Sequence, residues 1–189
     1  MTIQNPTKSA ENGVDVSAIL KAREALTAMP AGAQFTWSAR CEWLEGVHSR
    51  STISSFHGLG AHQERSRTFA IEADHPEVFA APDEAATPVE IVLSALASCL
   101  TGGIASVAQR RGIQLHSVVA KVEGDMDLQG ILGIDGSVRN GFSAIRVSFK
   151  IDADATHEEV EGLVAQSQKR SAVFDIITNP TNVKVNVSR

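Results

Sequence analysis

Hydrophobic and polar residues follow two periods along the chain, and these periods predict its first helix and its first strand. Apolar residues recur at helical spacing from Ser17 to Met29, and Pro30 ends the pattern. Strict alternation from Phe35 to Trp43 then predicts a strand with one buried face, on which Cys41 lies as a small buried residue.

Two further strands are predicted over residues 50–56 and 66–72, joined by the glycine-rich segment HGLGAH at 57–62. This segment lacks the strand–helix context and the third glycine of a nucleotide-binding motif, so it predicts a hairpin turn. His57 and His62 within it have no cysteine or carboxylate cluster beside them, so we expect exposed histidines and no metal site.

The longest apolar segment, Thr87 to Gly112, predicts a helix with both ends defined. Thr87 and Glu90 form a T-x-x-E capping box, while Gly112 closes the helix behind two arginines. The segment is apolar on every side, which predicts a central helix buried within the protein. Polar residues and glycines interrupt the segment too often for a membrane span, at Ser94, Ser98, Thr101, Gly102 and Gly103. The two glycines also allow another backbone to approach.

The remainder of the chain predicts two strands, a helix and a last strand. The strands cover residues 113–123 and 145–151, with a surface excursion over 124–141 between them. A second capping box, Thr156 and Glu159, begins a helix that reaches Ser171, and alternating valines predict a final strand at 183–187. This order predicts the α+β class with mainly antiparallel pairing, as one domain over 35–189 after a tail and helical extension over 1–34. The tail, Met1 to Gly13, is polar, and we expect it to lack regular structure.

Composition narrows the functional classes. The chain has 189 residues, of which 43% are hydrophobic, and this is enough for one sizeable core. A net charge of −5 with mixed signs gives no support for nucleic-acid binding. We expect a cytoplasmic protein because the N-terminal stretch has no hydrophobic segment of signal-peptide type. The two cysteines, Cys41 and Cys99, have no metal-ligand spacing, so neither a metal nor a cofactor is expected.

Cys99, near the middle of the predicted central helix, is the candidate for chemistry. A thiolate is the nucleophilic form of cysteine, and a free thiol has a pKa of about 8.5. Burial among apolar residues raises that pKa, so a reactive Cys99 needs a nearby cation or hydrogen-bond donors. No Lys or Arg lies within one helical turn of it, so a cation has to come from another segment or from a second subunit. Without such a group Cys99 is an inert core thiol.

Several motifs occur in an order that resembles the OsmC/Ohr family of organic hydroperoxide resistance proteins. They are PVEIVLSALASC at 88–99, RGI at 111–113, the stretch Val122 to Leu128, and RSAVFD at 170–175 before the NP pair. The match covers the chain from about Phe35 onward. The resemblance implies an intertwined homodimer with central helices between two sheets. It also implies thiol-dependent reduction of organic hydroperoxides by a peroxidatic cysteine, with a second, resolving cysteine and an Arg–Glu pair around the reactive thiol.

This chain carries only part of the pattern that the resemblance implies. Cys99 matches the peroxidatic position, but Ser171 stands at the second-cysteine position and cannot form a disulfide. Glu90 is one residue nearer the cysteine than the family glutamate and falls on the opposite helix face, so helix capping is the stronger alternative. Arg50 is the nearest candidate for the family arginine. Arg40, Arg65 and Arg67 stay open as alternatives.

Two hypotheses follow. In the first, the protein is a one-cysteine peroxidase in which Cys99 attacks an organic hydroperoxide and an external thiol regenerates it. In the second, it is a non-catalytic homodimer that binds a hydrophobic small molecule in the cleft between subunits, and Cys99 only packs. An arginine within hydrogen-bond reach of the Cys99 sulfur would favour the first.

Overall fold

The computed structural model describes residues 10–188, which form two compact units. The helix–hairpin unit comprises residues 10–14 and 93–188, and the sheet unit comprises residues 15–92. Helix α2 (Pro88–Arg111) begins in the sheet unit and continues into the helix–hairpin unit. The boundary after residue 34 that the sequence suggests stays a prediction.

The sheet unit begins with α1 and contains a four-stranded antiparallel sheet centred on β3. β4 pairs along one edge of β3, while β1 and β2 pair with successive stretches of its other edge. The elements are α1 (Val16–Ala28), η1 (Pro30–Ala33), β1 (Thr36–Trp37), β2 (Arg40–Glu45), β3 (His48–Gly58), β4 (Ala61–Ala73) and η2 (Glu77–Phe79).

The sequence predictions for this sheet are confirmed in outline and wrong in two details. The hairpin between β3 and β4 turns at Leu59 and Gly60, whose φ angles of 55° and 77° suit a two-residue turn. The strand predicted over 35–43 is interrupted, because the register changes by one residue between β1 and β2. The buried face is also absent, since every residue of β2, Cys41 included, is exposed in the single chain.

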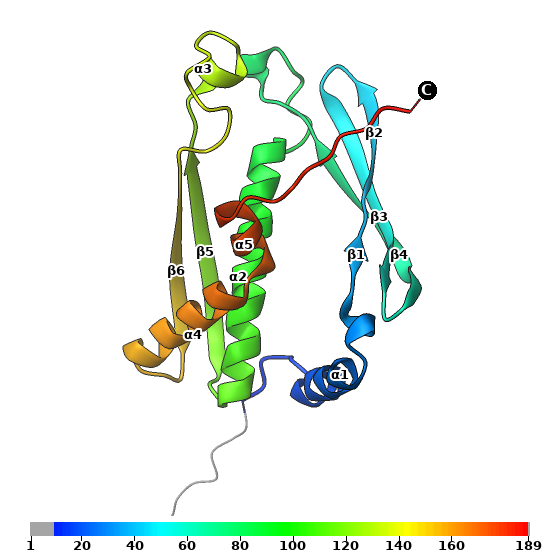
Figure 1. Ribbon diagram of the computed structural model, residues 1–189. Helices are drawn as coiled ribbons and strands as arrows, with labels where there is room; N and C mark the ends of the chain where they lie inside the picture. Colours follow the sequence, from blue (N-terminus) through cyan, green and yellow to red (C-terminus); the bar gives the residue numbers. More distant parts are fainter. Residues whose placement is uncertain (1–9, 189) are drawn as a thin grey trace, which may run out of the picture. The chain divides into compact units, whose positions relative to one another are not determined.

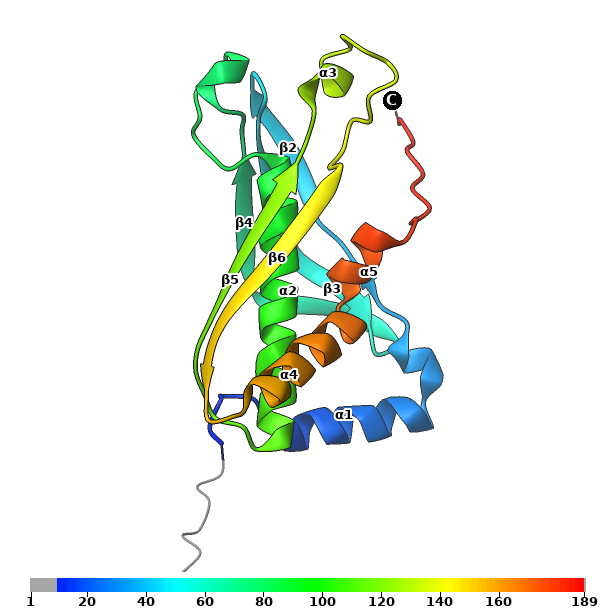
Figure 2. The ribbon, with the colours of Figure 1, turned by 90° about the vertical axis from the view of Figure 1, so that its left-hand side faces the viewer.

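The helix–hairpin unit consists of the larger part of α2, a two-stranded antiparallel hairpin and two C-terminal helices. Its elements are β5 (Leu115–Asp125), α3 (Leu128–Ile131), β6 (Ala144–Ala153), α4 (His157–Arg170) and α5 (Ala172–Thr178). Figures 1 and 2 show β5 and β6 running alongside α2, with α4 and α5 beside the same helix. The capping box of Thr156 and Glu159 that begins α4 is present as predicted.

The core of this unit forms where α2, the hairpin and α4 meet. Ile104 and Ala108 of α2 are fully buried against Leu163 of α4 and Ile113, and partly buried residues of β5 and β6 surround them. Along α2 the buried residues recur every four positions as Leu96, Leu100, Ile104 and Ala108, so the helix buries one stripe in the single chain. The prediction of burial on every side is therefore not met within one chain.

Both ends of α2 agree with the sequence prediction. Thr87 Oγ1 accepts a hydrogen bond of 3.3 Å from the Glu90 N–H, and the Glu90 carboxylate accepts one of 2.8 Å from the Thr87 N–H. Gly112 has a φ of 70°, and Ile113 N–H donates back to the Ala108 carbonyl, which ends the helix. Among the described residues α2 is the one helix long and apolar enough to span a membrane, a property that core helices of soluble proteins share.

The last strand predicted from the sequence is not present. Residues 179–188 have no regular structure, and Val183, Val185 and Val187 are exposed. A β-strand needs a neighbouring strand to satisfy its main-chain hydrogen bonds, and within the described chain no strand pairs with these valines.

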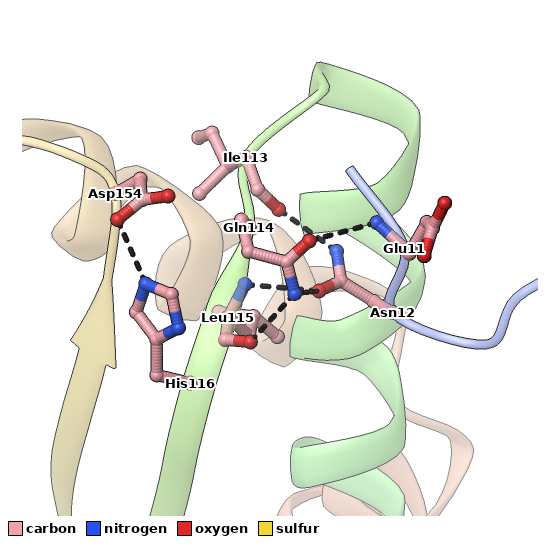
Figure 3. Close-up of polar contacts among 7 residues, drawn as sticks. All are labelled: Glu11, Asn12, Ile113, Gln114, Leu115, His116 and Asp154. Atoms are coloured by element: carbon pink, nitrogen blue, oxygen red, sulfur yellow. Dashed lines mark hydrogen bonds and ion pairs between the residues drawn. The ribbon is translucent and has the colours of Figure 1, made fainter. Parts of the chain in front are cut away.

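The N-terminal segment before α1 was predicted to lack structure over residues 1–13, and the described part of it is ordered. Asn12 Oδ1 accepts from the Leu115 N–H at 2.9 Å and its Nδ2 donates to the Ile113 carbonyl at 2.8 Å. The Gln114 Oε1 in turn accepts from the Glu11 N–H at 2.8 Å (Figure 3). Side-chain amides thus hold this segment against the α2–β5 junction. The rest of that prediction lies outside the described residues.

Candidate functional site

Cys99 and Ser171, which are 72 residues apart in the chain, are in direct contact. The Oγ atom of Ser171 lies 3.1 Å from the Sγ atom of Cys99, with the hydroxyl as donor. Cys99 is half-buried on α2, and Ser171 is buried between α4 and α5. The structure therefore brings together the two residues that the sequence singled out on separate helices.

Ser171 is held in place by the helix boundary at which it stands. It closes α4 by donating its N–H to the Gln168 carbonyl, and it caps α5 by accepting from the Phe174 N–H at 3.1 Å. Its extended backbone (φ −77°, ψ 116°) turns the chain between the two helices. The serine side chain thus lies between a main-chain donor and the Cys99 sulfur.

The pKa of Cys99 is lowered from its ordinary value, although burial, the largest single influence, raises it. Hydrogen bonds from the Ser171 hydroxyl and from the main-chain N–H groups of Val173 and Ala172 together outweigh burial. The sequence predicted that a reactive thiol here needs a cation or hydrogen-bond donors. Within the described unit the donors are supplied by Ser171 and by the start of α5.

The close approach of α4 to α2 positions this contact. Ser167 donates a 2.6 Å hydrogen bond from its hydroxyl to the Leu100 carbonyl, one residue beyond Cys99. Gly103 allows that approach, because a Cβ atom there would overlap the Ser167 side chain. Gly102, the other glycine of the pair, has open space beside it. The close approach predicted for the glycine pair is therefore made at Gly103.

Arg50, the predicted arginine, lies on β3 and is paired with a carboxylate of its own sheet. Its Nε donates to Glu72 Oε1 at 2.9 Å, and His48 contacts the other oxygen of that carboxylate at 3.1 Å. The pKa of Glu72 is lowered, chiefly by the hydrogen bond from Arg50. Arg50 belongs to the sheet unit and Cys99 to the helix–hairpin unit, so its predicted role beside the thiol stays a prediction.

The alternative arginines are also engaged within the sheet unit. Arg40 forms a 2.8 Å ion pair with Glu42. Arg65 and Arg67 both lie over the ring of Phe69, at 5.6 Å and 5.1 Å from its centre.

Glu90, the predicted acidic partner, has its carboxylate committed to the start of α2. One oxygen accepts from both the N–H and the hydroxyl of Thr87, each at 2.8 Å, and these bonds lower the pKa of Glu90. This is the helix-capping alternative that the sequence left open. A catalytic role for Glu90 stays a prediction.

Cys41 is an exposed thiol on β2 and not the buried residue that alternation predicted. Hydrogen bonds from Ser51 and Ser49, on the neighbouring β3, lower its pKa.

The two turn histidines, His57 and His62, are cross-strand partners at the ends of β3 and β4, and His62 contacts Glu64 at 2.8 Å. Residues 10–188 contain no group of three or more His, Cys, Asp or Glu side chains that could hold a metal.

Sequence reasoning missed α5 and its main-chain donors. The signal for it was present: Ser171 is a strong helix-capping residue and is followed by an acidic residue, Asp175, in the next turn. The helical pattern after Thr156 continues to Ser171 and predicts the end of one helix there, but it does not indicate that the same serine also begins the next helix.

Comparisons with known proteins give one family match and several similar solved structures. The family model described as OsmC-like protein matches residues 81–186. An OsmC-like protein from Mycoplasma pneumoniae superposes with a TM-score of 0.57 at 13% identity, over 76% of this chain and 87% of that chain. An organic hydroperoxide resistance protein from Legionella pneumophila gives a TM-score of 0.49 at 15% identity, over 75% and 89% of the two chains. A comparison with curated protein sequences gives no match.

Proposed function

Because the chain belongs to the OsmC-like protein family, we propose that it reduces organic hydroperoxides with Cys99 as the nucleophile and an external thiol as the reductant. The observation that carries this proposal is the 3.1 Å contact between Ser171 Oγ and Cys99 Sγ. A half-buried sulfur that accepts hydrogen bonds is stabilised as a thiolate, which is the form that attacks peroxides.

The first step oxidises Cys99. The thiolate attacks one oxygen of the hydroperoxide O–O bond, an S–O bond forms and the O–O bond breaks. The sulfur loses two electrons, and the departing alkoxide takes up a proton to give the alcohol. Cys99 is left as a sulfenic acid, the first stage of cysteine oxidation.

The second step returns Cys99 to the thiol. In the described structure the Ser171 side chain forms a hydrogen bond with the sulfur, and a hydroxyl cannot form a disulfide. An external thiol therefore condenses with the sulfenic acid, which releases water and forms a mixed disulfide. A second external thiol attacks this disulfide, so that Cys99 is released as a thiol and the two reductant molecules leave as their own disulfide.

We propose a homodimer as the working form, with Arg50 supplied to the thiol within it. Exposed apolar residues support this assembly: Val92 on α2 is 42% exposed, while Trp37 and Trp43 of the sheet are 65% and 73% exposed. In a dimer the alternating valines at 183–187 would also gain a strand edge to pair with. Light scattering should give the mass of two chains, and a stable folded monomer at micromolar concentration would remove this assembly.

The function is tested by hydroperoxide consumption in the presence of a dithiol reductant. Cys99→Ser should abolish consumption while the circular dichroism spectrum is unchanged, since the two side chains are similar in size. Cys41→Ser is the matched control, and it should retain consumption. Equal loss in both variants would contradict the one-cysteine mechanism.

Mass spectrometry of the Cys41→Ser protein tests the oxidation step itself. One equivalent of an organic hydroperoxide should add one oxygen to Cys99, and an excess should add a second. If Cys99 stays reduced under excess hydroperoxide, the peroxidase proposal fails. The alternative, a non-catalytic homodimer that binds a hydrophobic small molecule in the cleft between subunits, then takes its place.

A further inference from the structure

We propose that Ser171 is a positioning residue for Cys99, and that its hydroxyl donates a hydrogen bond that holds the sulfur in its deprotonated, nucleophilic form. The inference rests on the proposed function in taking Cys99 as the nucleophile. It gives an active role to the serine at the second-cysteine position, of which the sequence showed only that it cannot form a disulfide.

The direction of the hydrogen bond follows from the partners of Ser171. Its Oγ already accepts from the Phe174 N–H at 3.1 Å, so one lone pair is occupied. The acceptor found for its hydroxyl proton among the described residues is Cys99 Sγ, at 3.1 Å. Ser171 is only 6% exposed, so water competes little for that proton. The hydroxyl is therefore oriented toward the sulfur.

The arrangement forms a short relay from main chain to sulfur. The Phe174 N–H polarises the Ser171 hydroxyl, and a polarised hydroxyl is a better donor to an anion than an isolated one. Hydrogen bonds to a charged partner are about twice as strong as neutral ones. A thiolate gains more from this relay than a neutral thiol does, so the relay favours deprotonation of Cys99.

A purely structural serine has to be distinguished from this role, because Ser171 also caps α5. Ser167, which lies in α4, provides the control. It is buried to a similar degree and donates its hydroxyl to the Leu100 carbonyl, and among the described residues no hydrogen bond joins it to the Cys99 sulfur. Removing its hydroxyl costs stability at the α2–α4 contact without removing a donor from the thiol.

The test is the pH dependence of Cys99 alkylation by iodoacetamide, measured in the Cys41→Ser background across roughly pH 5 to pH 10. Ser171→Ala should move the midpoint upward by about one pH unit, which is roughly a tenfold loss of thiolate at neutral pH. Ser171→Thr keeps a hydroxyl at a helix cap and should retain the original midpoint. Ser167→Ala should leave the midpoint unchanged while lowering the melting temperature.

Ser171→Gly keeps an acceptable helix cap without a hydroxyl, so it replaces Ser171→Ala if that variant does not fold. An unshifted midpoint in a folded variant that lacks the hydroxyl overturns the inference, as does an equal shift in Ser167→Ala. Alkylation needs no hydroperoxide. A protein inert to hydroperoxides whose alkylation midpoint still depends on Ser171 would support this inference and disprove the proposed function.

Discussion

Gly103 on α2 faces Ser167 on α4 so closely that a Cβ atom at position 103 would overlap the serine side chain. Within this contact the Ser167 hydroxyl donates to the Leu100 carbonyl at 2.6 Å. A helical main-chain carbonyl is thus reached by a side chain of another helix only because the glycine leaves room. The same approach brings the end of α4, and with it Ser171, to Cys99.

Gly103→Ala should therefore destabilise the protein. The added methyl group forces α4 outward or breaks the Ser167 hydrogen bond, at a cost of about 1–3 kcal/mol typical of an overpacked contact. The matched control is Gly102→Ala, which meets no atom within 4 Å. It should stabilise α2 by up to about 1 kcal/mol through helix propensity. Urea unfolding measures the free energy of unfolding of both variants, and an equal change in the two would contradict the close contact between Gly103 and Ser167.

Glu90→Ala tests whether Glu90 does more than begin α2. Its carboxylate accepts two bonds from Thr87, so the variant should lose roughly 0.3–1.5 kcal/mol of stability. The main-chain N–H of Thr87 is the chief cause of the lowered pKa of Glu90. The stabilisation that the Glu90 carboxylate gives the folded protein is therefore present above the ordinary carboxyl pKa. It is lost as the pH falls through the lowered pKa of the folded state.

The control for Glu90 is Glu159, which caps α4 through the same set of bonds from Thr156. Glu159→Ala should lower stability and leave hydroperoxide consumption per folded molecule unchanged. If Glu90→Ala behaves in the same way, Glu90 is a capping residue only. Loss of consumption in Glu90→Ala alone would instead establish the catalytic role that the family resemblance suggests.

Helix ends were predictable from the sequence because their causes are local. Thr87 and Glu90 are three residues apart, as are Thr156 and Glu159, and each pair forms the reciprocal bonds that its spacing predicts. The φ of 70° at Gly112 also has a local cause, because glycine readily takes the left-handed conformation that ends a helix.

Properties that depend on distant neighbours were not predictable in the same way. The valines at 183–187 have the alternation of a strand, but alternation cannot supply the partner strand that pairing requires. Cys41 lies on an alternating strand as predicted, yet burial depends on what covers that face, and in the single chain it is exposed. The Ser171–Cys99 contact joins residues 72 apart. The sequence indicated Cys99 from its central helix and Ser171 from the family pattern, and only the structure supplies the hydrogen bond between them and its direction.

Asn12→Ala tests the attachment of the N-terminal segment to the α2–β5 junction. The Asn12 side chain makes three bonds, to the Ile113 carbonyl, the Leu115 N–H and the Gln114 side chain (Figure 3). Their loss leaves partly buried main-chain groups unpaired and should cost about 1–3 kcal/mol. Glu11→Ala is the control, since Glu11 bonds through its main-chain N–H. Equal urea midpoints for the two variants would show that the side-chain amide contributes nothing.

The pKa of His116 is raised above its ordinary value, first by its 2.7 Å hydrogen bond to Asp154 and then by the charge of that carboxylate (Figure 3). Because the pKa of His116 is higher in the folded than in the unfolded state, the His116–Asp154 pair stabilises the folded protein below the unfolded pKa. This stabilisation is lost as the pH rises through the folded pKa. NMR titration of the imidazole should show the raised pKa in the parent protein. Asp154→Asn should return it toward about 6.5, and an identical titration in that variant would exclude Asp154 as the cause.

Ser171→Cys should restore an internal disulfide with Cys99. The present Oγ–Sγ distance of 3.1 Å lies between two side chains that already face each other, and a small adjustment brings two sulfur atoms to the roughly 2.05 Å of a disulfide. In the Cys41→Ser background, one equivalent of an organic hydroperoxide should oxidise Cys99 to the sulfenic acid. The introduced thiol should then condense with it and release water.

Mass spectrometry separates the two outcomes of that experiment. The parent protein should gain one oxygen, whereas the Ser171→Cys variant should lose two hydrogens and regain them on treatment with a dithiol. Ser167→Cys is the matched control, because position 167 faces the Leu100 carbonyl and not the Cys99 sulfur. Its thiol should stay reduced while Cys99 gains oxygen. A Ser171→Cys protein that also gains oxygen without forming the disulfide would mean that the two sites do not reach bonding distance in solution, and the arrangement of α4, α5 and α2 around Cys99 would then have to be revised.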